Sequence, residues 1–109
     1  MVDRTNAIKL AKQFLEDCIK GGVSITSAWM FGSYVKGNPR EYSDIDLALV
    51  SDDFTRNFLD NNHKTALINF NYPDIEVHHF NRMAFMQHDP FVEEIKKTGI
   101  EIYNGKVAA

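Results

Sequence analysis

The chain has 109 residues, of which 44% are hydrophobic and 25% are charged, and its formal net charge is −3. This length fits one domain, and this composition is typical of a folded globular protein rather than a disordered one. The negative charge argues against a protein that binds nucleic acid by neutralising many phosphates, and the single cysteine, Cys18, excludes an intrachain disulfide and a multi-cysteine zinc site.

The first half of the chain predicts one helix and two strands. Residues 5–20 form an amphipathic helix that Gly21 ends, because apolar residues recur there at spacings of three and four. These are Ile8, Ala11, Phe14, Leu15, Cys18 and Ile19. Residues 25–31 are β-branched and aromatic and lead to Gly32, which predicts a buried strand and a tight turn. After a polar loop, residues 44–50 predict a second, central strand.

The middle of the chain predicts a less regular helix and a third strand. Between residues 51 and 68 apolar residues recur at helical spacing but unevenly, and the pair Asn61-Asn62 is expected to interrupt the helix. Residues 75–80 include β-branched Ile75 and Val77 and follow the turn Asn71-Tyr72-Pro73, so we expect a strand there.

The C-terminal third predicts a helix and a short strand. Asp89 and Pro90 are typical of an N-cap and a first helical residue, and Gly99 is typical of the residue that closes a helix. The side chains expected to be buried are Phe91, Val92 and Ile95. Residues 100–103 predict the last strand. Helices and strands thus alternate in one α/β domain over residues 1–109, with a flexible tail at about 104–109.

No stretch of the sequence predicts export or membrane insertion. The N-terminal residues lack the apolar centre of a signal peptide, and no run approaches the roughly 18 apolar residues of a membrane span. We therefore expect a cytoplasmic protein, which agrees with its single cysteine. Cys18 lies on the apolar stripe of the first helix and is expected to be a buried, inert thiol.

Two acidic residues at the second strand indicate a metal site. Side chains alternate along a strand, so Asp44 and Asp46 point to one face and Ile45 and Leu47 to the other. Unpaired carboxylates so placed repel each other, and a divalent cation between them relieves the repulsion. Oxygen ligands favour Mg²⁺ or Mn²⁺ over Zn²⁺, and such ions neutralise the phosphates of nucleotides.

The turn after the first strand has the composition of a phosphate-binding loop. Gly32 lets the backbone approach a ligand closely, and Ser33 adds a hydroxyl and an amide where a short helix is expected to begin. Lys36 and Arg40 lie in the same loop, but loop charges are usually solvated, and we leave both out of the core site.

The combination of Gly32-Ser33 with Asp44-Ile45-Asp46 resembles the signature of the nucleotidyltransferase superfamily related to DNA polymerase beta. The segments FGSYVKG (31–37) and SDIDL (43–47) resemble more closely the motifs of minimal nucleotidyltransferases (MNT, MntA-like), and the likeness extends to Gly99–Tyr103. The resemblance implies the nucleotidyltransferase fold, in which helices flank a small mixed β-sheet.

The resemblance also implies the site residues. A third carboxylate is expected on a later strand, where Glu76 is the candidate and Asp74 the alternative. Asp44, Asp46 and Glu76 would then be catalytic and hold two Mg²⁺ ions, with Mn²⁺ as the other possibility. Gly32 and Ser33 would bind the phosphates of ATP. The remaining candidates for ligands have no regular spacing and are expected to be packed or exposed instead: His63, His78, His79 and His88.

The resemblance implies an enzyme that moves AMP from ATP to a hydroxyl of a partner protein. Minimal nucleotidyltransferases of this type resemble antitoxins, which silence a small helical HEPN toxin by adenylylating a tyrosine. The short chain agrees with this, because it has no second domain to hold an acceptor. Two alternatives stay open: an antitoxin that neutralises its partner by binding alone, and a nucleotidyltransferase that acts on a small molecule or an RNA end.

Overall fold

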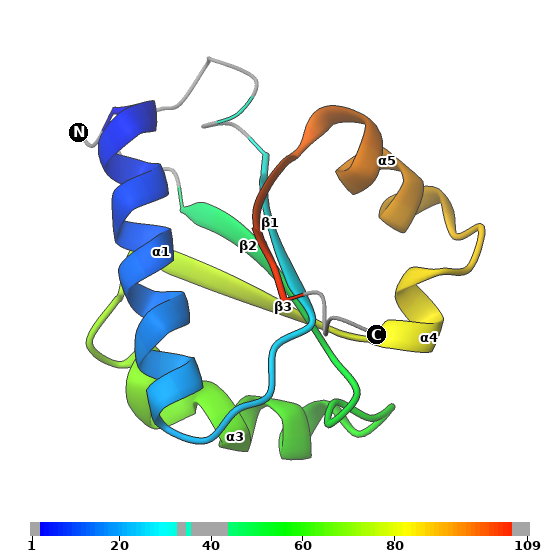
Figure 1. Cartoon of the computed structure of the whole chain (residues 1–109), viewed down its shortest axis with the longest axis horizontal. Helices are drawn as coiled ribbons and strands as arrows, with labels where there is room; N and C mark the ends of the chain where they lie inside the picture. Colours follow the sequence, from blue (N-terminus) through cyan, green and yellow to red (C-terminus); the bar gives the residue numbers. More distant parts are fainter. Residues whose placement is uncertain (1–2, 33–34, 36–43, 106–109) are drawn as a thin grey trace.

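The computed structural model of the chain describes residues 3–32, 35 and 44–105. Four strands form one sheet, with α1 and α3 against one face and α4 and α5 against the other (Figure 1). The alternation of helices and strands and the helix-flanked sheet confirm the expected fold class. Ser33, Lys36 and Arg40 lie outside the described residues, as does most of the tail expected to be flexible.

The sheet is mixed, in the order β3-β2-β1-β4. Its strands are β1 (Ser27–Phe31), β2 (Ile45–Ser51), β3 (Ile75–Asn81) and β4 (Ile100–Asn104). β1 pairs antiparallel with β2 and β4, whereas β2 and β3 run parallel. Parallel neighbours need a crossover, which α3 (Phe58–Asn69) provides. All four strands occur where the sequence predicted them, and β3 is a free edge.

The first and last predicted helices are confirmed. α1 (Arg4–Lys20) begins where the Asp3 carboxylate accepts a hydrogen bond from the backbone N–H of Asn6. α5 (Pro90–Thr98) begins in the same way at Asp89. Phe91, which was expected to be buried, is 44% exposed, and Ile19 on the apolar stripe of α1 is 39% exposed. Each lies at the margin of the apolar stripe of its helix, so the sheet covers only one side of the residue.

The predicted break at Asn61-Asn62 is wrong, because both residues lie inside α3. Asn61 is buried, and its side-chain amide bonds both backbone groups of Thr55 in the preceding loop. An asparagine that is satisfied in this way no longer competes with the helix for backbone hydrogen bonds. A short helix that the sequence did not predict, α4 (Arg82–Phe85), follows β3 and is capped by the Asn81 side chain.

Alternation along the strands divides the core between the two faces of the sheet. Ala28, Met30, Ile45, Leu47 and Leu49 pack against α1 and against Phe54. Phe31, Ala48 and Val50 face α4 and α5. By the same alternation Asp46 belongs to the α4/α5 face, at the end of the sheet where that apolar core stops.

Cys18 is buried on α1, as expected. Burial, with a smaller contribution from neighbouring Asp17, raises the pKa of its thiol to about 12. The thiol is therefore protonated and unreactive near neutral pH. Among the described residues, no helix is both long enough and apolar enough to cross a membrane.

Candidate active site

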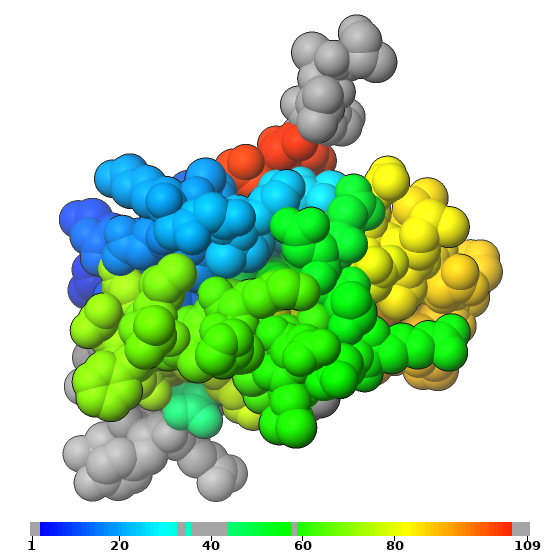
Figure 2. Space-filling model, turned by 90° about the horizontal axis from the view of Figure 1, so that it is seen from below, coloured from blue at the N-terminus to red at the C-terminus, as the bar shows by residue number. Residues whose placement is uncertain are grey.

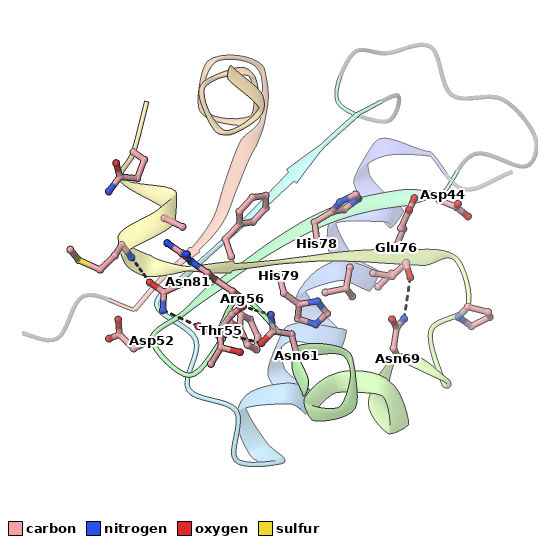
Figure 3. A pocket seen from close by; sticks show the side chains of 18 residues that line it. Asp44, Asp52, Thr55, Arg56, Asn61, Asn69, Glu76, His78, His79 and Asn81 are labelled. Atoms are coloured by element: carbon pink, nitrogen blue, oxygen red, sulfur yellow. Dashed lines mark hydrogen bonds between the residues drawn. The ribbon is translucent and has the colours of Figure 1, made fainter. Parts of the chain in front are cut away.

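The strand register places three side chains in a row across the sheet. Phe31 at the end of β1 pairs with Asp46 on β2, and Asp46 pairs with Glu76 on β3. His78 lies two residues beyond Glu76 and points to the same side of β3, whereas His79 points to the other (Figure 3). One ligand atom from each of Asp46, Glu76 and His78 lies within 4.8 Å of the other two. Two of the predicted carboxylates thus meet, and a histidine joins them.

Two features of the structure require glycine at position 32: its backbone conformation and the carboxylate of Asp46 next to it. Its φ is +84°, a conformation that side chains rarely adopt. A Cβ at this position would also overlap Oδ2 of Asp46. The carboxylate therefore fits against the backbone of the turn where a larger residue would place its side chain. The turn and the acidic strand are in direct contact, as their shared motif predicts.

Asp44 and Asp74 lie one residue ahead of β2 and β3. The two strand ends are joined there, since the Ile45 N–H donates to the Asp74 carbonyl over 2.7 Å. Both aspartates are exposed, and within the described part of the chain neither contributes a ligand atom to the group formed by Asp46, Glu76 and His78. Asp44 and Glu76 nevertheless both line one groove (Figure 3).

His78 is held by aromatic packing. Its ring lies edge-on to those of Phe31 and Phe91, with centroids 5.1 and 5.9 Å away. Its Nε2 atom lies 3.3 Å from Oδ1 of Asp46, and its side chain is 27% exposed. The ring is packed on its sides, and its polar end faces the Asp46 carboxylate. The sequence signal that His78 lies near the carboxylates was its position two residues after Glu76, on the same strand face.

The groove follows the free edge of β3 and has a volume of about 1540 Å³. Asp44, Glu76 and His78 lie at one end, and Asp52 and Asn81 lie at the other (Figure 3). Side chains from both faces of β3 line it, so it wraps around the edge of the sheet. It is open and large enough to admit a nucleotide together with part of an acceptor.

His79 has a structural role on the opposite face of β3. Its Nε2 lies 2.8 Å from Oγ1 of Thr65, and its ring packs edge-on to Phe54. Burial lowers the pKa of its imidazole to about 4, and the nearby charges of His78 and Lys64 act in the same direction. His79 is therefore neutral near pH 7 and joins α3 to the sheet.

Comparisons with known proteins identify the family and the fold. A family model described as "Polymerase beta, Nucleotidyltransferase" matches residues 13–107. No curated protein matches the chain. Among solved structures, a candidate nucleotidyltransferase from Sulfolobus solfataricus shares 16% identity with a TM-score of 0.70, over 94% of this chain and 84% of that one.

Two toxin–antitoxin complexes are also similar. One contains AMP-PNP, with 14% identity and a TM-score of 0.60 over 86% of this chain and 73% of that one. The other is a tri-AMPylated HEPN toxin from Shewanella oneidensis in complex with an MNT antitoxin. It shares 16% identity with a TM-score of 0.52, over 93% of this chain and 72% of that one. At these identities the likeness is one of fold.

Proposed function

This chain belongs to the polymerase beta nucleotidyltransferase family, and we propose that it transfers AMP from ATP to a hydroxyl of a partner protein. The observation that carries the proposal is the contact between the Gly32 turn and Asp46, with Glu76 beside it across the parallel strand pair. A glycine turn suited to phosphate binding and a pair of carboxylates then lie together, as nucleotide transfer requires.

The donor set at this end fits divalent cations. Asp46 and Glu76 offer carboxylate oxygens that already approach each other, and the exposed Asp44 lies one residue ahead of β2, next to this strand pair. These three residues would hold Mg²⁺ or Mn²⁺, and two ions are expected. Bound ions of this kind neutralise the triphosphate and lower the pKa of an attacking hydroxyl.

The protein's own groups orient the reactants. The backbone at Gly32 and the Ser33 hydroxyl bind the β and γ phosphates of ATP, so that the α phosphate faces the groove. The acceptor oxygen attacks the α phosphorus in line, a new P–O bond forms, and the bond to the bridging oxygen breaks as pyrophosphate leaves. Glu76 is exposed at the groove and takes up the acceptor's proton.

The outer face of α3 supports a protein as the acceptor. This helix turns polar Asn61 and Thr65 toward the core, whereas Leu59, Leu67 and Phe70 are 76%, 87% and 85% exposed. The residues recur at helical spacing and therefore form one stripe, the α3 stripe. Figure 2 looks onto the face of the molecule that α3 crosses beside α1. An exposed apolar stripe of this kind is typical of a protein-binding surface.

The partner we propose is a small helical toxin of the HEPN kind, and the chain would act as its antitoxin in the cytoplasm. The two similar toxin–antitoxin complexes support this choice of partner. An antitoxin that binds through the α3 stripe without catalysis is the second candidate, because that stripe alone would hold a partner. It differs in one respect, since the carboxylates would then be dispensable for neutralising the toxin.

The test incubates the purified protein with α-labelled ATP, Mg²⁺ and a small helical HEPN-type protein as the candidate partner. We expect label on the partner with the wild type and none with Asp46→Asn. Glu101→Gln is the matched control, because this exposed carboxylate lies on β4 at the opposite edge of the sheet and should label normally. Equal labelling by wild type and Asp46→Asn would overturn the catalytic proposal. Neutralisation of the toxin without labelling would favour the second candidate.

A further inference from the structure

His78 is the one member of the described ligand group that was not predicted from the sequence as a site residue. Resting on the proposed function, we infer that His78 is a direct ligand of the divalent cation bound there, and that its imidazole shifts the preference of the site from Mg²⁺ toward Mn²⁺ and Co²⁺. The cation then binds through Asp46, Glu76 and His78 on two parallel strands.

The spacing between the ligand atoms of His78 and Asp46 fits this assignment. Metal–ligand distances of about 2.0–2.2 Å separate two ligand atoms by about 3 Å at a right angle and by about 3.4 Å at a tetrahedral angle. Nε2 of His78 lies 3.3 Å from Oδ1 of Asp46, between these values. The same distance is long for a hydrogen bond between a ring N–H and a carboxylate, for which about 2.7–2.9 Å is usual.

The surroundings of His78 hold the imidazole in this position. Phe31 and Phe91 pack edge-on against the ring from β1 and α5, so the ring is confined by two elements besides its own strand. Asp46 is confined as well, because its carboxylate fits against Gly32. The side chains of His78 and Asp46 are 27% and 24% exposed, which leaves room for water or phosphate to complete the coordination.

The chemical consequence follows from ligand type. Mg²⁺ prefers oxygen ligands and gives up its water reluctantly, whereas imidazole binds first-row transition ions increasingly well from Mn²⁺ to Co²⁺. A site with two carboxylates and one imidazole therefore binds Co²⁺ and Mn²⁺ more tightly than an all-oxygen site would. Removing the imidazole should reduce the affinity for these ions and leave that for Mg²⁺ nearly unchanged.

The direct test is pulsed EPR of Mn²⁺ bound to protein labelled with ¹⁵N-histidine, in the presence of a non-hydrolysable ATP analogue. Labelling distinguishes imidazole nitrogen from the nitrogens of adenine. We expect a ¹⁵N coupling of directly bound imidazole in the wild type and its loss in His78→Gln. His88→Gln is the matched control and should keep the coupling, because His88 is 96% exposed and pairs with Glu93.

Calorimetric titration adds a second readout. In His78→Gln and in a second variant, His78→Asn, Co²⁺ affinity should fall about tenfold or more while Mg²⁺ affinity changes less than about threefold. Circular dichroism checks that the variants are folded. An equal loss for both ions, or Mn²⁺ bound without imidazole coupling, would overturn the assignment and leave His78 as a residue that orients Asp46. If the wild-type protein shows the imidazole coupling but transfers no AMP, the assignment of His78 as a ligand stands and the proposed function is contradicted.

Discussion

The Gly32 turn allows the sharpest prediction, because a second glycine provides its control. Gly32 and Gly22 both have positive φ, +84° and +96°. A Cβ on Gly32 would overlap the Asp46 carboxylate, whereas a Cβ on Gly22 would meet nothing within 4 Å. Alanine at either position adds the same kind of backbone strain, but only at Gly32 does it also displace a proposed metal ligand.

The magnitudes follow from these two effects. Backbone strain alone should lower the free energy of unfolding by about 1–2 kcal/mol in Gly22→Ala, which is a fall in Tm of about 5–15 °C for a domain of this size. Gly32→Ala should be at least as destabilised. A displacement of Asp46 by about 1 Å should also reduce AMP transfer by about 100-fold, whereas Gly22→Ala should retain wild-type transfer.

The assay pairs thermal unfolding with initial rates of AMP transfer, measured well below the Tm of each variant. Mg²⁺-dependent binding of an ATP analogue by calorimetry gives a further readout that does not depend on the partner. Gly32→Ala with wild-type rates and ligand affinity would refute the claim that this glycine makes room for Asp46. An equal loss of activity in Gly22→Ala would show that strain, rather than the carboxylate contact, controls the site.

Three further predictions concern other parts of the molecule. Leu67→Glu should leave stability and ATP-analogue binding unchanged, because Leu67 is 87% exposed on the α3 stripe. It should weaken partner binding, measured by surface plasmon resonance, by about tenfold or more. Unchanged partner binding would exclude the α3 stripe as the binding surface. Asn61→Ala should lower the free energy of unfolding in urea by about 1–3 kcal/mol, because the backbone N–H and carbonyl of Thr55 both lose their hydrogen bonds to this side chain. A change below about 0.5 kcal/mol would contradict this. Since burial raises the pKa of Cys18 to about 12, stability should fall as the pH rises above about 9, where only the unfolded chain ionises. Native Cys18 should then react with thiol reagents only at the rate of unfolding, and faster labelling at pH 8 would show that the thiol is accessible.

Local signals predicted most of the framework. Asp89-Pro90 and Gly99 delimit α5 because capping depends on residues close in sequence. β1 and β3 could be predicted because their β-branched and apolar residues end at Gly32 and begin after the turn before β3, respectively. The acidic pair and Gly32-Ser33 indicated a site for the same reason, since each motif lies within one short segment.

The features that the sequence did not predict depend on contacts between distant segments. The Asn61 interpretation failed because Thr55 satisfies its amide across a loop. His78 was assigned no role because its place near Asp46 depends on β2 and β3 pairing in parallel with Ala48 opposite it. The exposure of Leu67 and Phe70 could not be inferred from a helical pattern, which gives the spacing of apolar residues and not the face that the sheet covers.

The central claim is that the carboxylates beside the Gly32 turn transfer AMP to a protein. Its most direct measurement is the intact mass of the helical partner after incubation with ATP and Mg²⁺. We predict that the partner gains the mass of one or more AMP groups with the wild-type protein, gains none with Asp46→Asn, and gains the wild-type mass with Glu101→Gln. A partner of unchanged mass with the wild type, or the same added mass with Asp46→Asn, would contradict it.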